Sequence, residues 1–307
     1  MRDAAAAAAP SLRVQTVLYG NPATATRRSL TSLARACQQA KQDGILGTVS
    51  LYVGDSSSLP ALNATERAEL DATLVDHGID SFQYDFFDAN LGSAGGHNRL
   101  LTLFEQDLLL ILNPDVVADP FLINELFLPL AEPLVGVVEA RQLPLEHPKP
   151  YDHGTGETPW VTTACALVRR TVLDQVGGFD AESFFLYCDD VDWSWRVRLA
   201  GHRLVLQPSA RVFHDKRIDE RGHLVIGEAM TYYSAEAALF MFHKYSRRDL
   251  VDHYLRVFEA GAEERPLEAQ AAREYHARVA AGRVPEPLDP EGRVATFVNG
   301  QYAAHRF

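Results

Sequence analysis

The 307 residues are enough for one large domain, or for one domain with an appendage. Hydrophobic residues make up 47% of the chain and charged residues 23%, which is the balance of an ordinary globular protein. The formal charge of −12 argues against nucleic acid as a partner, because binding to phosphates requires a basic face; it also disfavours a polybasic membrane anchor.

No stretch approaches the roughly 20 apolar residues of a membrane span. Residues 1–11 are rich in alanine and lack the leucine-rich core of a signal peptide, so we expect a disordered leader and a cytoplasmic protein. The three cysteines, Cys37, Cys165 and Cys188, are scattered and lack metal-ligand spacing, which predicts reduced thiols.

Strand and helix patterns alternate over the first 140 residues. Strand patterns cover residues 12–18, 48–53, 81–85 and 108–112, and helical patterns cover residues 24–40 and 64–77. This alternation predicts an α/β fold, with a mostly parallel sheet flanked by helices. Ligands of such sheets bind beyond the carboxyl ends of the strands, so we expect Tyr19, Asp55 and the turn at 113–115 to share one crevice.

The pattern changes after residue 140. We expect a loop over residues 144–159, a strand over 161–168, and helices over 171–176 and 190–200. Residues 229–281 are mostly helical in pattern, and a tail follows. We therefore divide the chain into a domain at 12–225 and a helical C-terminal extension at 226–307. The extension can pack on the domain, pair with a second copy, or rest on a membrane.

Three carboxylates, Asp189, Asp190 and Asp192, stand within four positions at the start of a predicted helix. Acidic groups this close repel each other and need a cation, a basic neighbour or a shared proton. We place the chemistry here. The alternative is the charged N-terminus of a solvated helix.

Several motifs in order resemble those of family 2 glycosyltransferases. They include Val53-Gly-Asp55, Asn90-Leu-Gly-Ser-Ala-Gly-Gly-His-Asn98, Leu112-Asn-Pro-Asp115 and Phe184-Phe-Leu-Tyr-Cys-Asp-Asp-Val-Asp192. The resemblance covers about residues 12–215 and is greatest to bacterial rhamnosyltransferases of surface polysaccharide synthesis. It implies a GT-A fold, a nucleoside-diphosphate-sugar donor, a divalent metal (Mg²⁺ or Mn²⁺) and inversion at the anomeric carbon.

The resemblance also assigns residues to the donor. Asp55 and Tyr19 would contact the base, and Asn98 would begin a helix near the donor; the alternative for Asp55 is a cap on the serine-rich turn that follows it. The residues placed around the donor are Tyr19, Asp55, Asn90, Gly92, Gly96, Asn98 and Asn113.

By the same resemblance, Asp115 is the first metal ligand and His214 completes the shell. Family members usually carry two or three carboxylates at the motif that contains Asp115, whereas this chain has Asn113 and one Asp there. The alternatives are a turn residue at Asp115 and a packed strand-end histidine at His214.

Family correspondence makes Asp190 the general base that deprotonates the acceptor hydroxyl. A nearby negative charge raises the basicity of such a carboxylate, a role that suits Asp189. Asp192 can pair with Arg196 or contact substrate. Trp160 is the candidate for stacking on the acceptor.

The leading hypothesis is transfer of rhamnose from dTDP-rhamnose to a glycan or lipid-linked glycan in O-antigen or related polysaccharide synthesis, with peripheral contact at the inner face of the membrane. Arg169 is the candidate for holding the diphosphate. A rival is a sugar nucleotidyltransferase, which needs a basic glycine-rich loop, but the turn at 19–22 has no Lys. Another rival is a catalytically silent nucleotide-sugar-binding scaffold. A homodimer through the C-terminal helices is a further expectation.

Overall fold

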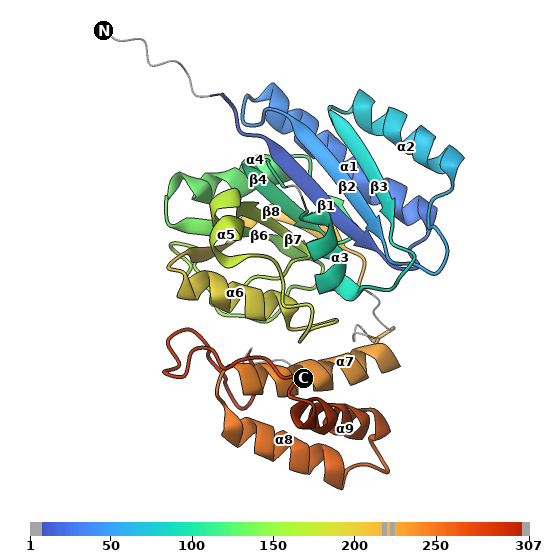
Figure 1. Cartoon of the computed structure of the whole chain (residues 1–307). Coiled ribbons are helices and arrows are strands. Elements are labelled where there is room, and N and C mark those ends of the chain that lie inside the picture. The colour runs from blue at the N-terminus through green and yellow to red at the C-terminus, as the bar shows by residue number, and fades with distance from the viewer. Residues whose placement is uncertain (1–7, 103, 217–219, 222–224, 303–307) are drawn as a thin grey trace.

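The computed structural model describes residues 8–102, 104–216, 220–221 and 225–302. Its centre is an eight-stranded sheet with strand order β3-β2-β1-β4-β7-β6-β8-β5 (Figure 1). The strands are β1 (Leu12–Leu18), β2 (Val49–Asp55), β3 (Ser81–Phe86), β4 (Leu108–Leu112), β5 (Val116–Ala118), β6 (Val135–Leu143), β7 (Cys165–Arg169) and β8 (Arg203–His214).

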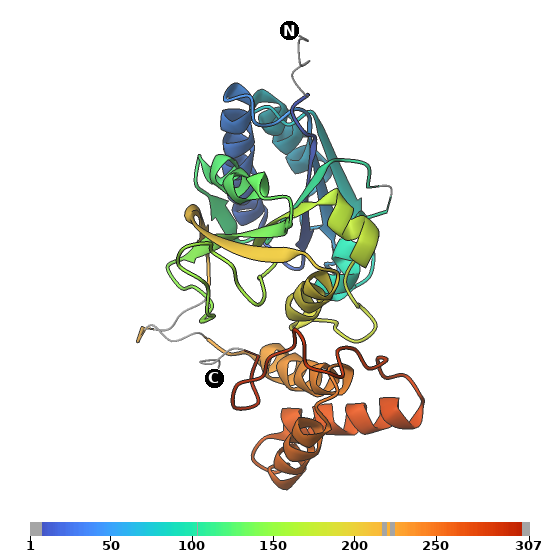
Figure 2. The same ribbon diagram turned by 90° about the vertical axis from the view of Figure 1, so that its left-hand side faces the viewer.

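Helices cover both faces of the sheet and form a further layer beside it. They are α1 (Ala23–Gln42), α2 (Ala64–Asp76), α3 (Gly92–Leu100), α4 (Leu122–Phe127), α5 (Arg170–Val176), α6 (Asp189–Leu199), α7 (Glu228–Lys244), α8 (Arg248–Ala260) and α9 (Pro266–Ala280), with a short 3-10 helix at Leu128–Ala131. Helices α1, α2 and α4 pack on one face, and α3, α5 and α6 pack on the other (Figure 2).

The two halves of the sheet differ in direction. Strands β1 to β4 are parallel to one another, while β7 runs antiparallel to both β4 and β6. Strand β6 then pairs in parallel with β8, and β5 is antiparallel to β8. The carboxyl ends of β1, β2, β4, β6 and β8 therefore meet at one edge of the sheet.

Strand β4 explains why this sheet forms the core. All five of its side chains are buried, and they alternate between two clusters. Leu108, Leu110 and Leu112 face α1 and α4, and Leu109 and Ile111 face α5 and α6. Burial of each such side chain contributes about 1.5–3 kcal/mol, so a strand of this composition is stable only between two layers. The prediction of a doubly buried strand is confirmed.

The C-terminal helices share a hydrophobic cluster with the rest of the chain. Phe184, Val191 and Trp195 pack with side chains of α7, α8 and α9, which lie together below the sheet in Figures 1 and 2. The tail joins the same cluster through Val294 and Phe297. The domain boundary near residue 225 stays a prediction, and most of the expected leader, residues 1–7, lies outside the described residues.

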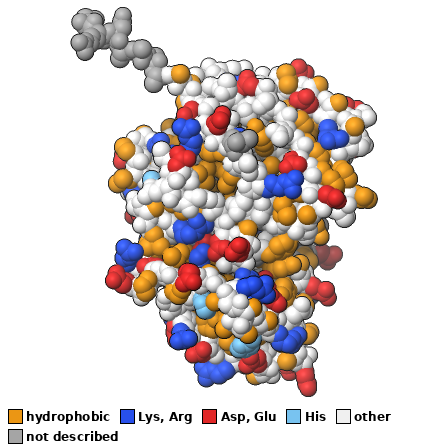
Figure 3. Space-filling model, viewed as in Figure 1, with side chains coloured by type: hydrophobic (Ala, Val, Ile, Leu, Met, Phe, Trp, Pro, Cys, Tyr) orange, Lys and Arg blue, Asp and Glu red, His pale blue; other side chains and the backbone are white. Residues whose placement is uncertain are grey.

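The surface and the helices set further limits. On the face seen in Figure 3, acidic and basic side chains are interspersed among apolar ones, without a continuous area of one charge. None of the helices in the described part of the chain combines the length and the apolar character that a bilayer span requires. The three cysteines are buried free thiols.

Candidate active site

Backbone contacts join the turns after β1 and β2 to the start of α3. The amide of Ser56 donates to the carbonyl oxygen of Leu18 (2.9 Å), and the amide of Gly20 donates to Ser57 Oγ (2.8 Å). The amide of Leu91 donates to Ser56 Oγ (3.4 Å). These turns are the ones at which the sequence predicts a donor site. Tyr19 lies among them and is 65% exposed.

Asp55 is fully buried at the end of β2 and its carboxylate is already hydrogen-bonded. Oδ1 accepts from the amide of Ser57 (2.9 Å), and Oδ2 accepts from the amide of Ala61 (2.7 Å) and from the hydroxyl of Tyr84. This arrangement matches the turn-capping alternative. Contact between Asp55 and a base stays a prediction.

The glycine-rich segment has two glycines in close contact with other elements. Gly92 begins α3 with a φ of +67°, and a Cβ there would lie 2.2 Å from the carbonyl oxygen of Phe185. A Cβ on Gly96 would lie 2.7 Å from a methyl group of Val17, so this glycine lets α3 approach β1. Gly96 is buried, and its contact with β1 gives it a packing role; its contact with the donor stays a prediction. Asn90 is exposed.

Asn98 does not begin the helix that follows the glycines, so that prediction is wrong. Helix α3 runs from Gly92 to Leu100, which places Asn98 in its last turn. The side chain of Asn98 donates to the carbonyl oxygen of Phe179 (2.7 Å) and accepts from the amide of Phe179 (2.8 Å). Asn98 therefore fixes the loop before α6.

Asp115 and His214 face each other where β4 and β8 end. Asp115 Oδ1 lies 3.2 Å from His214 Nε2, and the two side chains are 39% and 10% exposed. On the other side of the ring, His214 Nδ1 is 2.7 Å from Gln142 Oε1. The backbone supports the pair, because the amide of Asp215 donates to the carbonyl oxygen of Asp115 (2.9 Å). The amide of Asn113 donates to the carbonyl oxygen of Ala164 (2.9 Å), which ties this turn to β7.

The oxygen of Asp115 and the nitrogen of His214 are suitable ligands for a divalent cation. A carboxylate oxygen and an imidazole nitrogen are ligands that Mn²⁺ accepts, and Mg²⁺ prefers oxygen ligands and substrate phosphates. Within the described residues, no three His, Cys, Asp or Glu side chains are grouped to hold a metal ion. A cation at Asp115 and His214 would therefore take its remaining ligands from a diphosphate and water.

The acidic pair stands on a strained turn at the start of α6. Tyr187 and Cys188 both have left-handed backbone angles, with φ values of +67° and +58°. Such angles cost about 1–3 kcal/mol for residues with a side chain and are frequent at functional sites. They turn the chain so that Asp189 is buried while Asp190, next to it, is half-buried.

Burial, followed by the charge of Asp190, raises the pKa of Asp189 to about 7. A hydrogen bond from Ser93 in the first turn of α3 opposes this rise. The bond also shows that α6 and α3 begin beside each other. A carboxyl group that titrates near neutrality changes the charge around Asp190 at working pH.

Asp192 is not accessible to a substrate. It is fully buried, and it pairs with Arg196 (2.9 Å), as the sequence predicts, and with Lys244 of α7 (2.8 Å). The hydroxyl of Tyr245 donates to the same carboxylate (3.0 Å). Asp192 therefore links α6 to α7, and this corrects its prediction as a substrate-binding residue.

Two further predictions differ from the structure. Trp160 is only 2% exposed and packs edge-on against Tyr302, so its ring faces are closed to an acceptor. Arg169 pairs with Leu108 at the amino end of β4 and donates to the carbonyl oxygen of Val135 (2.9 Å). It therefore lies at the edge of the sheet opposite Asp115, too far from it to hold a shared diphosphate.

Sequence reasoning did not identify Ser93, Gln142 or Lys244. Ser93 lies inside the glycine-rich motif, which was the signal available for it. Lys244 was hidden in a helix whose role the sequence left open. Gln142 follows Glu139 in a strand that begins with apolar residues, and a buried carboxylate in such a strand is the sign of a polar network.

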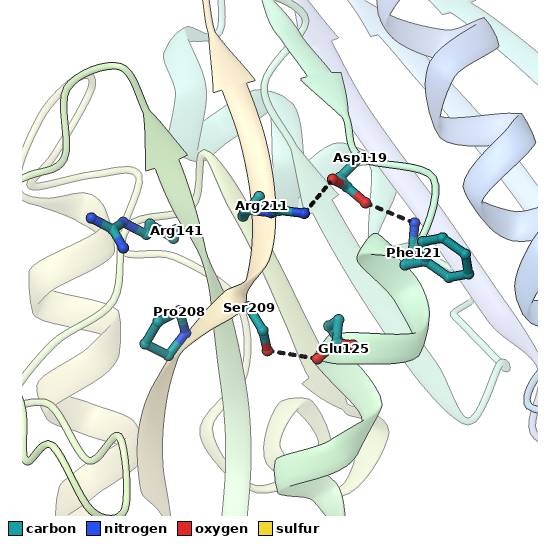
Figure 4. A pocket seen from close by; sticks show the side chains of 7 residues that line it. All are labelled: Asp119, Phe121, Glu125, Arg141, Pro208, Ser209 and Arg211. Atoms are coloured by element: carbon teal, nitrogen blue, oxygen red, sulfur yellow. Dashed lines mark hydrogen bonds and ion pairs between the residues drawn. The ribbon is translucent and has the colours of Figure 1, made fainter.

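A cavity of about 410 Å³ beside α4 is lined by none of these residues (Figure 4). Its polar groups largely satisfy each other, since Arg211 pairs with Asp119 (3.1 Å) and Ser209 donates to Glu125 (2.6 Å). Its lining residues are Asp119, Phe121, Glu125, Arg141, Pro208, Ser209 and Arg211. We assign no ligand to it.

Comparisons with known proteins bear on the fold and on the family resemblance. No family model matches the chain. The chain is 43% identical over 77 residues to N-acetylglucosaminyl-diphospho-decaprenol L-rhamnosyltransferase of Mycobacterium tuberculosis, a match that covers 24% of this chain and 25% of the relative. It is 37% identical over 62 residues to rhamnosyltransferase WbbL of Escherichia coli strain K12, covering 20% and 23%. The chain thus spans about a quarter of these relatives.

Two solved structures show the fold. Mannosyltransferase PcManGT from Pyrobaculum calidifontis, in complex with GDP-Man and Mn²⁺, superposes with a TM-score of 0.56 at 19% identity, covering 89% of this chain and 76% of that one. GalNAc-T7 with UDP, GalNAc and Mn²⁺ gives a TM-score of 0.60 at 10% identity, covering 89% and 58%.

The chain has the GT-A fold of glycosyltransferases, as the sequence predicts. The predicted resemblance to bacterial rhamnosyltransferases is likewise confirmed.

Proposed function

We propose that this protein is an inverting, metal-assisted glycosyltransferase. The donor is a nucleoside-diphosphate sugar, most consistent with dTDP-rhamnose, and the acceptor is a glycan or lipid-linked glycan of surface polysaccharide synthesis. Support comes from the relatives, one of whose names specifies a rhamnosyl transfer to a diphospho-lipid. It also comes from two neighbours bound to Mn²⁺, one with GDP-Man and the other with UDP and GalNAc.

One observation carries the proposal. A carboxylate oxygen of Asp115 and a ring nitrogen of His214 face each other at the edge of the sheet where the turns after β1 and β2 also lie. A divalent cation held there would neutralise the charge that develops on the departing nucleoside diphosphate.

The acidic pair supplies the proton acceptor. Asp190 takes the proton of the acceptor hydroxyl while the bond from that oxygen to the anomeric carbon forms. The bond from the anomeric carbon to the diphosphate oxygen breaks in the same step, which inverts the configuration. Asp189, when ionised, increases the basicity of Asp190 through its charge.

The test is transfer from dTDP-rhamnose to a synthetic N-acetylglucosaminyl-diphospho-lipid with Mn²⁺ or Mg²⁺. Release of dTDP together with the disaccharide product supports the proposal. The variant Asp190→Asn should bind dTDP as the wild type does and lose about 10²–10⁴-fold in kcat. The control Asp174→Asn changes an exposed carboxylate on α5 and should leave both unchanged.

Other results would favour the alternatives. Binding of dTDP-rhamnose without turnover on any acceptor would indicate a scaffold, and formation of dTDP-rhamnose from dTTP would indicate a nucleotidyltransferase. Retention of most turnover by Asp190→Asn would contradict its role as the base. We also propose a cytoplasmic location at the inner face of the membrane, because that is where a lipid-linked acceptor would be met; a homodimer through α7–α9 stays a prediction.

A further inference from the structure

We propose, on the basis of the function proposed above, that Gln142, Thr162 and Glu139 are positioning residues for the metal site. They hold the imidazole of His214 with the Nε2 lone pair toward Asp115, and they thereby set the affinity of the site for a divalent cation.

Three hydrogen bonds form a chain that leads away from His214. The hydroxyl of Thr162 donates to Glu139 Oε1 (2.7 Å). Gln142 Nε2 donates to Thr162 Oγ1 (2.8 Å), so Gln142 Oε1 is the acceptor that faces His214 Nδ1 at 2.7 Å. Because an ionised carboxylate only accepts, the direction of every link follows from Glu139. Nδ1 therefore carries the ring proton, and Nε2 keeps its lone pair.

Lys149 keeps Glu139 in the acceptor form. Its ammonium donates to Glu139 Oε2, and both side chains are fully buried. Burial raises the pKa of Glu139, and the charge of Lys149 opposes that rise. Lys149 Nζ also lies 4.5 Å from the ring centroid of Trp160. The ion pair therefore ties the loop at 144–159 to β6, and the cation–π contact ties it to the segment that follows the loop.

Burial makes this chain of hydrogen bonds rigid. Glu139, Gln142 and Thr162 are 0%, 1% and 3% exposed, so water has little access to replace their hydrogen bonds. Oriented partners of this kind fix the ring and the tautomer of metal-binding histidines in proteins.

The backbone of β6 brings two of these side chains to one place. Residues three apart on a regular strand point to opposite faces, yet Glu139 and Gln142 both reach Thr162. The pairing of β6 with β8 is interrupted between Ala140 and Arg141, where the register shifts. Irregularities of this type redirect side chains beside functional sites.

The fixed tautomer matters because of what Nε2 faces. Nε2 lies 3.2 Å from Asp115 Oδ1, so a lone pair and a carboxylate oxygen converge there. A cation relieves this repulsion, whereas a proton on Nε2 would satisfy the carboxylate and close the site. The hydrogen-bond chain thus favours the tautomer of His214 that has its lone pair on Nε2, even before a metal binds.

The experiment measures Mn²⁺ affinity by electron paramagnetic resonance, with dTDP present, in the wild type and in two variants. Gln142→Leu removes the acceptor for Nδ1 at similar size, and Thr162→Val removes the middle of the chain. Both should weaken Mn²⁺ binding about 10–100-fold, and Thr162→Ser should restore it. The matched control is Gln175→Leu, which removes a hydrogen bond to His202 (2.9 Å) at the other edge of the sheet and should change nothing.

A second measurement does not need the metal. Long-range ¹H–¹⁵N spectra of histidine-labelled protein should show His214 with the proton on Nδ1 in the wild type, and with a mixture of tautomers in Gln142→Leu and Thr162→Val. A role confined to stability would lower the melting temperature without moving these signals. If Gln142→Leu does not fold, the comparison of Thr162→Val with Thr162→Ser decides.

The outcomes separate the two proposals. Suppose that Mn²⁺ binding is lost in Asp115→Asn but unchanged in Gln142→Leu and Thr162→Val. The positioning role would then be overturned while the metal site stands. A wild-type protein that binds no Mn²⁺ with dTDP would overturn the metal-assisted function itself. Mixed tautomers of His214 in the wild type would overturn the positioning role directly.

Discussion

Replacing Asp189 with Asn should make the protein more stable at high pH. Asp189 is buried beside Asp190, and its Oδ2 atom has no hydrogen-bond partner among the described residues. An asparagine keeps the shape and an oxygen that can accept from Ser93, and it removes the charge. Because the buried amide brings a constant cost of its own, the pH dependence is the informative quantity.

The size of the effect follows from the pKa, which rises from 3.8 to about 7 on folding. A carboxyl group with a raised pKa binds its proton more tightly in the folded state. Below pH 3.8 the carboxyl group of Asp189 therefore does not lower the free energy of unfolding. The cost grows as the pH rises from there to about 7, and it is constant above that pH. Each pKa unit corresponds to about 1.4 kcal/mol, so the ionised carboxylate destabilises the fold by about 4 kcal/mol at alkaline pH.

Urea unfolding of both proteins across a pH series measures this directly. The free energy of unfolding of Asp189→Asn minus that of the wild type should increase by about 3 kcal/mol between about pH 4.5 and about pH 8.5. The titrating groups other than Asp190, whose charge interacts with that of Asp189, are common to both proteins and largely cancel in the difference. Two parallel curves would refute the assignment of a raised pKa to Asp189.

Three further predictions concern the acidic pair and its supports. The kcat/KM of the wild type should rise through about pH 7 as Asp189 ionises, and that rise should be absent in Asp189→Asn, as pH–rate profiles would show. Lys244→Met leaves the buried Asp192 and the half-buried Asp180 without their shared ammonium and should cost about 3–5 kcal/mol in urea unfolding. The exposed ion pair lost in Arg247→Met should cost less than about 1 kcal/mol. Gly92→Ala combines a positive φ with a 2.2 Å clash and should lower the free energy of unfolding by about 3 kcal/mol. Gly177→Ala, where φ is also positive but the space is open, should lower it by about 1 kcal/mol. Thermal melts would measure both.

Local patterns were enough for the elements of the first half. The apolar run of β4 and the turn signals after β1 and β2 predict a buried sheet with a polar edge, and the fold has both. Strands β5, β6 and β8 were not predicted, since their order and direction depend on pairing partners far apart in the sequence. A strand with a buried carboxylate, such as Glu139 in β6, also departs from a simple apolar pattern.

Some residues of the candidate site could likewise be predicted from sequence motifs, and others could not. Asp115, Asp190 and His214 stand in sequence motifs. Asp115 and His214 lie together where β4 and β8 end, and Asp190 lies at the start of α6, so a site shared by all three stays a prediction. Trp160 and Arg169 could not be placed from the sequence, because burial and the direction of β7 are properties of the whole fold. A tryptophan after a polar loop looks accessible until the tail that covers it is known.

The ion pairs between α6 and α7 bear on how this chain can be divided. The turn that presents Asp190 is anchored through Asp192 to Lys244, more than fifty residues later, and Trp195 beside it is covered by Tyr245 and Phe297. A protein shortened to its sheet-containing part would expose the apolar side of α6 to water. It would also leave Asp192 without the ammonium group of Lys244. We therefore expect the last helices to be needed for the position of the turn that carries Asp189 and Asp190.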